Sequence, residues 1–164
     1  MCLSTAFAGL HDMKNFAGRF SPQLYAVLRI MAGLMFALHG TQKLFGWPGG
    51  QEPAGAAMMK FAGVVELAGG LLIALGLFTS VAAFVCAGQM AAAYFMAHAR
   101  QSFWPVLNQG ELAALYCFLF LYVAAHGSGI WSVDGARHKG GTSTAPTGSA
   151  SDGATTSSDI STPV

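Results

Sequence analysis

The sequence predicts an all-α integral membrane protein, a four-helix bundle with up-down-up-down topology and a disordered C-terminal tail. Four apolar stretches lie between about residues 23 and 126, and each is long enough to cross a bilayer. Only 9% of the 164 residues are charged, against about a quarter in an average soluble domain. Spanning strands are excluded because four strands cannot close a barrel and an open sheet edge cannot face lipid. A soluble bundle is disfavoured because residues 67–78 carry no charge on any helix face.

The first element is an N-terminal cytoplasmic or interfacial segment, residues 1–21. It contains His11, Lys14 and Arg19, and it lacks the compact apolar core and small-residue cleavage site of a secretory signal peptide. We therefore expect it to remain on the mature protein, with an amphipathic helix on the membrane surface as one possible form.

The transmembrane domain is expected over residues 22–134. Its spans are placed at residues 23–45, 58–78, 81–98 and 111–126. Pro22 suits the first turn of a helix, because that turn needs no backbone donor. Glycine and proline at 46–50 end the first span, and Gly127-Ser128-Gly129 ends the fourth. At about 1.5 Å per residue the spans measure roughly 24–35 Å, which matches a hydrocarbon core of about 30 Å.

The composition changes abruptly after the last span. Residues 135–164 are rich in Ser, Thr, Gly and Ala. Such a segment buries too little apolar surface to offset its ordering entropy, so we expect a disordered tail.

Basic residues outside the spans predict the orientation. Lys14 and Arg19 precede the first span, and Arg137 and Lys139 follow the fourth. An even number of crossings puts both ends on one side, and positive residues favour the cytoplasm. Both termini are therefore predicted to be cytoplasmic, although Arg100 opposes this orientation.

Ionisable residues inside the spans point to a site. Arg29, His39 and Lys43 fall within an arc of roughly 80° on the first span. Arg29 lies near the cytoplasmic end, where it either joins this set or only extends its head group to the interface. Glu66 lies about eight residues inside the second span, where a charge costs about 2.5–3.5 kcal/mol and needs a partner.

Depth predicts which groups meet. His39 and Glu66 share a depth on antiparallel spans, with Lys43 one turn further out, so we expect a Glu66–His39–Lys43 cluster in the outer half of the bundle. Further polar residues expected near it are Gln89, His98 and Glu111. The cluster has two interpretations: structural glue between helices, or a polar pocket that binds an anionic or quinone-like ligand or relays protons.

Other signals exclude classes of site or predict packing. Cys2, Cys86 and Cys117 have no paired spacing, so we expect no disulfide framework and no metal site. A net charge of +1 provides no basic surface for nucleic acid. Small residues are spaced for close helix packing in three groups: Gly33 with Ala37 and Gly40, Gly70 with Ala74, and Gly88 with Ala92.

Several motifs together resemble the DoxX family. They are HGTQKLFG at 39–46, ELAGG at 66–70, NQGELA at 108–113 and WSVD at 131–134. The resemblance covers residues 28–134 and implies a four-helix protein of the bacterial inner membrane. Some members are named as subunits of a thiosulfate-oxidising, quinone-reducing complex, and others are linked to assemblies that handle thiol and oxidative stress. The positions it carries over are Arg29, His39, Lys43, Glu66 and Glu111.

Function is predicted at the level of a subunit. The chain has no flavin, haem or iron–sulfur motif, so we do not expect a complete oxidoreductase. The resemblance then implies a non-catalytic or accessory subunit of a quinone- or thiol-linked membrane complex. No covalently bound cofactor is expected, and a quinone is the candidate ligand. The expected partners are the lipid bilayer, a membrane or periplasmic redox protein, or a second copy of the chain. The alternatives are a small proton-coupled transporter that uses Glu66 and a structural assembly factor.

Overall fold

The computed structural model describes residues 18–49 and 55–140. Residues 1–17 of the expected N-terminal segment and residues 141–164 of the expected tail lie outside the described residues. The described residues are helical and contain no strand, which confirms the predicted fold class. The helices are α2 (Ser21–Phe45), α3 (Ala57–Leu75), α4 (Thr79–Ala93), the π-helix η1 (Tyr94–His98), α5 (Pro105–Asn108), α6 (Glu111–His126) and α7 (Val133–Gly140).

Glycines end the first two long helices. The chain turns left-handed at Gly46 (φ 71°) after α2 and at Gly76 (φ 71°) after α3, a conformation that glycine adopts without strain. The amide of Gly76 then donates to Ile73. The second span therefore ends at Leu75 and not at Phe78, because Gly76 closes the helix first.

The third span is longer than expected and changes its winding. It begins at Thr79, and its last five residues, Tyr94–His98, form η1. The wider turn is closed by the amide of Ala99, which donates to the Tyr94 carbonyl at 2.8 Å. Short π-helical segments within α-helices are frequent at functional sites.

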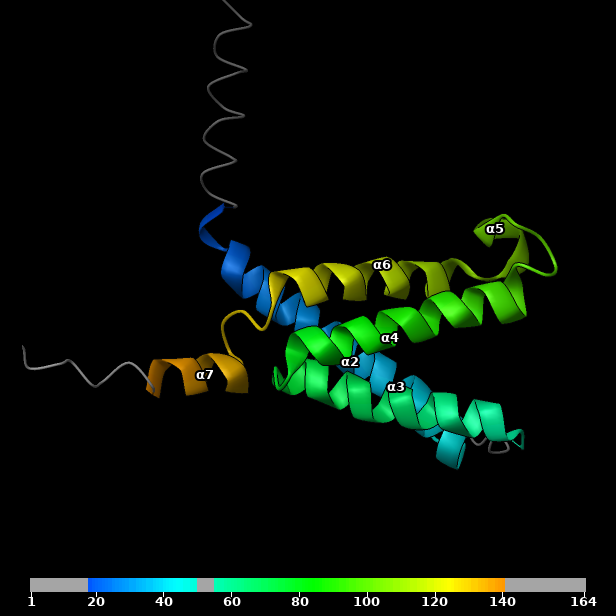
Figure 1. Ribbon diagram of the computed structural model, residues 1–164, viewed down its shortest axis with the longest axis horizontal. Coiled ribbons are helices and arrows are strands. Elements are labelled where there is room, and N and C mark those ends of the chain that lie inside the picture. The colour runs from blue at the N-terminus through cyan, green and yellow to red at the C-terminus, as the bar shows by residue number, and fades with distance from the viewer. Residues whose placement is uncertain (1–17, 50–54, 141–164) are drawn as a thin grey trace, which may run out of the picture.

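The bundle consists of two closely packed helix pairs, α2 with α3 and α4 with α6 (Figure 1). Glycines bring α2 and α3 into backbone contact: a Cβ on Gly33 would lie 2.6 Å from the Gly70 carbonyl oxygen, and one on Gly70 would lie 2.5 Å from that of Gly33. The first two groups of small residues thus pack against each other. Gly88 is exposed and has nothing within 4 Å of its Cβ position, so it makes no such contact within the chain.

The surface of the bundle is apolar. Large hydrophobic side chains such as Met31, Phe84 and Phe118 are exposed on different helices, as expected of helices that face lipid. Three helical stretches, Ser21–Phe45, Ala57–Leu75 and Thr79–His98, are long and apolar enough to cross a membrane. α6 is also apolar but shorter, at 16 residues.

The short helix α7 extends beyond Asp134, where the membrane domain was expected to end, and it fastens the chain to the α3–α4 turn (Figure 1). The Asp134 amide donates to Gly76 at 3.0 Å, and its carboxylate accepts from the amides of Phe78 and Thr79, both at 3.1 Å. Burial alone would raise the pKa of Asp134. The hydrogen bonds from Thr79 and Phe78 and the charge of Arg137 outweigh it, so the pKa of Asp134 is lowered.

Candidate functional site

An ion pair between the end of α2 and the middle of α3 forms the centre of the site. The Lys43 ammonium donates to Glu66 Oε1, and the Glu66 side chain is only 2% exposed. Gly63, one turn before Glu66, makes this contact possible, because a Cβ there would lie 3.1 Å from Lys43 Cβ. The sequence thus leaves space for the lysine to reach across to the carboxylate.

A third helix completes the cluster. Gln89 on α4 donates its amide nitrogen to Glu66 Oε1 at 3.2 Å and to the Ala62 carbonyl at 3.2 Å. Two buried oxygens remain without a hydrogen-bond partner in the described structure, Glu66 Oε2 and Gln89 Oε1. Buried polar atoms normally have partners, so these two oxygens mark a place where a donor is missing.

A cavity of about 240 Å³ lies beside the ion pair, and all four long helices contribute to its wall. Its polar lining comes from His39, Lys43, Glu66, His98, Gln109 and Tyr116. Phe36, Met90, Ala93, Leu112 and Ala113 provide the apolar lining. The cavity therefore combines polar and apolar lining residues in nearly equal number.

His39 takes a different position from the one predicted. Its ring lies edge-on to Tyr116 of α6, with the ring centroids 6.3 Å apart. Within the described part of the chain the Glu66 carboxylate is bonded by Lys43 and Gln89, so the expected three-membered cluster has Gln89 in the place of His39. The imidazole is directed toward α6, whereas the longer lysine reaches α3.

His98 reaches the cavity from the π-helix. Its Nδ1 lies 3.0 Å from the backbone oxygen of Asn108. A carbonyl only accepts hydrogen bonds, so Nδ1 is the nitrogen that carries the hydrogen, and in the neutral ring Nε2 is then an acceptor. The wider winding of η1 sets the direction in which this ring points.

A second hollow adjoins the cavity. This groove of about 640 Å³ lies between α3 and α4 and shares Lys43, Ala93 and His98 with the cavity. Gln89 is the remaining polar residue in its wall. The other lining residues are apolar: Met58, Met59, Phe61, Ala62, Val65, Val85, Ala92, Met96 and Ala97. The wall of the groove is thus apolar apart from three polar residues, Lys43, Gln89 and His98.

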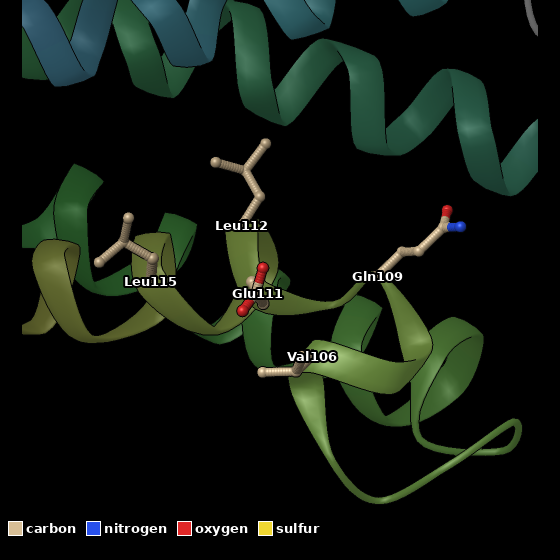
Figure 2. Close-up of a pocket in the computed structure, with 5 residues that line it drawn as sticks. All are labelled: Val106, Gln109, Glu111, Leu112 and Leu115. Atoms are coloured by element: carbon tan, nitrogen blue, oxygen red, sulfur yellow. The ribbon is translucent and has the colours of Figure 1, made fainter.

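Glu111 lies outside this site. It is exposed at the start of α6, in an open hollow with Val106 and Leu115 that borders the cavity at Gln109 and Leu112 (Figure 2). Figure 2 shows Leu112 on the same helix projecting in another direction, toward the neighbouring helices. The first turn of α6 therefore directs Leu112, and not Glu111, into the cavity wall.

Arg29 also lies apart, at the opposite end of the bundle. It is fully buried and donates to Ile73, to Ala74 at 2.9 Å and to Trp131 at 2.8 Å. The protein covers the guanidinium, which provides donors for carbonyls near the end of α3, although Ile73 also accepts from the Gly76 amide.

Two cavity residues, Gln109 and Tyr116, were not among the predicted site residues. Both belong to the segment that closes the cavity from the α6 side. The available signal was a tyrosine inside an apolar span and the polar Asn108-Gln109 pair just before it. Among the described residues no group of three or more His, Cys, Asp or Glu side chains is placed to hold a metal ion.

The sequence is similar to known proteins. The DoxX family model matches residues 24–99, a range that contains Lys43, Glu66, Gln89 and His98. An uncharacterized protein of Haemophilus influenzae Rd is 43% identical over 123 residues, which cover 71% of this chain and 92% of that protein. No solved structure matches the chain.

Proposed function

Since this chain belongs to the DoxX family of membrane proteins, we propose that it is an accessory subunit of a membrane redox complex and binds a quinone-class ligand. The observation that carries the proposal is the cavity between the four long helices, whose polar wall is built around the Lys43–Glu66 pair. In this proposal the electron donor is a membrane or periplasmic partner protein.

The charge of the site favours an uncharged ligand. Lys43 and Glu66 neutralise each other, so the cluster offers hydrogen bonds without a net charge. An anionic ligand would compete with Glu66 for the Lys43 ammonium, and a charge carried into hydrocarbon is costly. A neutral head group with oxygen atoms meets neither penalty.

The groove between α3 and α4 favours a ligand that arrives from the membrane. It is apolar along its length and meets the polar cavity at Lys43 and His98. A molecule with a small polar ring and a long hydrocarbon tail would place its ring in the cavity and its tail in the groove. Quinones of the bilayer have this form.

The ion pair gives less support to a proton-coupled transporter. Glu66 would have to exchange its contact with Lys43 for a proton in every transport cycle. The Gln89 bond to the same oxygen would have to break as well. Because Glu66 Oε1 already accepts two hydrogen bonds, it is better suited to a structural role in a ligand-binding site.

The proposal is tested by what the protein carries out of its native membrane. The full chain is extracted without detergent into polymer-bounded nanodiscs, and quinone per protein is measured by mass spectrometry. We expect clear enrichment over the quinone-to-lipid ratio of the bulk membrane. The double variant Lys43→Met/Glu66→Gln removes both charges together and should lose the enrichment, whereas Glu111→Gln, outside the cavity, should keep it. No enrichment in the wild type would contradict the proposal.

A further inference from the structure

The hydrogen-bonding groups at the ion pair are unequally used. Glu66 Oε1 accepts from both Lys43 and Gln89, while Oε2 of the same carboxylate has no partner in the described structure. The Gln89 nitrogen donates twice, to Ala62 and to Glu66, while its oxygen accepts nothing there. The groups without partners are therefore both acceptors.

An acceptor buried without a donor is unfavourable, because its interactions with water are lost and nothing replaces them. Glu66 is 1% exposed and lines the cavity. An O–H group that reaches Oε2 from the cavity would restore the missing bond. A molecule that offers only carbonyl oxygens would place lone pairs against lone pairs.

His98 adds to this bias. Its Nδ1 is engaged by the Asn108 carbonyl, so a neutral His98 ring presents the acceptor Nε2 to other partners. Lys43, His39, Gln109 and Tyr116 can donate from the same wall, and a donor bonds equally well to a hydroxyl or a carbonyl oxygen. The discriminating groups are thus acceptors, and the donors do not discriminate.

Building on the proposed function, we infer that the cavity selects the reduced, dihydroxy form of the quinone over the oxidised form, through a hydroxyl that donates to Glu66 Oε2. The second oxygen of the ring accepts from Lys43 in either form. The same wall that binds a quinone-class molecule therefore distinguishes its two oxidation states by the direction of one hydrogen bond.

The preference has a measurable consequence for redox equilibrium. A hydrogen bond to a charged group corresponds to roughly a tenfold preference or more in binding. Tighter binding of the reduced form raises the midpoint potential of the bound couple, by about 30 mV for each tenfold preference in a two-electron couple. The site would then hold the product of quinone reduction more firmly than its substrate.

The test compares the two forms directly. The full chain is purified into nanodiscs of quinone-free lipid, and binding of decyl-benzoquinone and of its quinol, kept reduced under argon, is titrated after subtraction of uptake by empty nanodiscs. We expect the quinol to bind at least tenfold more tightly. Equal affinities, or tighter binding of the quinone, would overturn the inference and leave the proposed function standing. Binding of neither form above the empty nanodiscs would overturn both.

Variants assign the preference to one group. Glu66→Gln offers an amide that serves either form, so the quinol-to-quinone ratio should fall toward one, while the matched variant Glu111→Gln should keep the wild-type ratio. A Glu66→Gln protein that retains the full tenfold ratio would show that Glu66 is not the selecting group. If Glu66→Gln does not fold, the midpoint potential of decyl-benzoquinone bound by the wild-type protein takes its place: we expect it to lie about 30 mV or more above the potential in empty nanodiscs, and an unchanged potential would overturn the inference.

Discussion

Arg29 shows how one buried residue joins three distant parts of the chain. Its guanidinium binds the last carbonyls of α3 and the Trp131 carbonyl of the segment that leads into α7. The planar guanidinium group of arginine can donate to several acceptors at once, whereas the ammonium group of a lysine lacks this fixed geometry. The residue therefore holds one end of the bundle closed.

Replacing this side chain tests its structural role. Arg29→Met leaves buried carbonyls without donors, each worth roughly 1–3 kcal/mol, so we expect a loss of at least about 2 kcal/mol in the free energy of unfolding. The free energy of unfolding of Arg29→Lys should lie between those of Arg29→Met and the wild type. Denaturant unfolding in detergent micelles measures the change, with the exposed Arg19→Met as control. If Arg29→Met is as stable as Arg19→Met, the capping role is wrong.

The Lys43–Glu66 pair makes a second prediction at this scale. Each single variant, Lys43→Met or Glu66→Gln, leaves one charged partner without its counter-charge. The double variant removes both charges, so no charge is left unpaired. We expect the double variant to lose less stability than the two single losses added together, with a coupling of roughly 1–3 kcal/mol in a double-mutant cycle. Strict additivity would mean that the pair does not interact.

Asp134 gives a dependence on pH. Its lowered pKa means that the ionised carboxylate stabilises the fold above its ordinary pKa of 3.8, and that this contribution is lost as pH falls through the still lower folded value. Asp134→Asn removes the charge at the N-terminus of α4 and should cost roughly 0.3–1 kcal/mol at pH 7. The melting-temperature difference between the two proteins should shrink below pH 3.8. A difference that stays constant with pH would contradict the assignment.

Depth in the membrane was predictable from the sequence, but the rotation of a side chain was not. The fixed rise per residue placed Lys43 and Glu66 at neighbouring depths, and the structure brings them into contact. His39 and Glu111 have suitable depths too, but their directions depend on how α2 and α6 rotate against their neighbours. Arg29 was uncertain for the same reason, since the sequence alone does not show that helix-end carbonyls surround it.

At the scale of helices, glycine decides where the chain allows close approach. Gly33 and Gly70 place backbone against backbone between α2 and α3, which positions Lys43 for its reach to Glu66. The spacing of small residues predicted such contacts, but it did not separate Gly33 from Gly88, which faces outward. The spacing of small residues shows that they lie on one face of a helix, but it does not show which helix packs against that face.

A pair of matched variants tests this contact. Gly33→Ala inserts a methyl group 2.6–2.7 Å from backbone atoms of Gly70 and Ala74, so we expect a loss of roughly 1–3 kcal/mol. Gly88→Ala meets no neighbour and should gain up to about 1 kcal/mol from helix propensity. Unfolding of both proteins in the same micelles gives the comparison. Equal effects would argue against backbone contact at Gly33.

The change from α-helix to π-helix at the end of the third span was not predictable from its local sequence. A sequence of alanines and aromatics continues smoothly from α4 into η1, and no residue in it signals a change of winding. Residues of the wider turn make tertiary contacts, among them the bond from the Tyr94 hydroxyl to Phe103 and that between His98 and Asn108. These partners follow later in the chain, so the sequence of the span does not reveal them.

At the scale of the whole molecule, the positively charged ends predict the orientation. Antiparallel packing places the start of α2 and the end of α6 at the same end of the bundle (Figure 1). Single cysteines introduced at Ser21 and at Ser128 in a protein without its native cysteines should therefore both be protected from a membrane-impermeant thiol reagent in intact cells. A cysteine at Trp47, in the opposite loop, should react. Labelling of the first two would reverse the orientation.

The central claim is that the cavity and the groove between α3 and α4 form one site for a lipid-soluble ligand. The most direct measurement is photo-crosslinking in native membranes with a quinol that carries a diazirine on its tail, followed by peptide mapping. The account predicts label on groove residues such as Phe61, Val85 and Met96, which excess unlabelled quinol and the variant Lys43→Met/Glu66→Gln both suppress. Label spread evenly over lipid-facing residues such as Phe84 and Leu121, and unaffected by competitor, would contradict it.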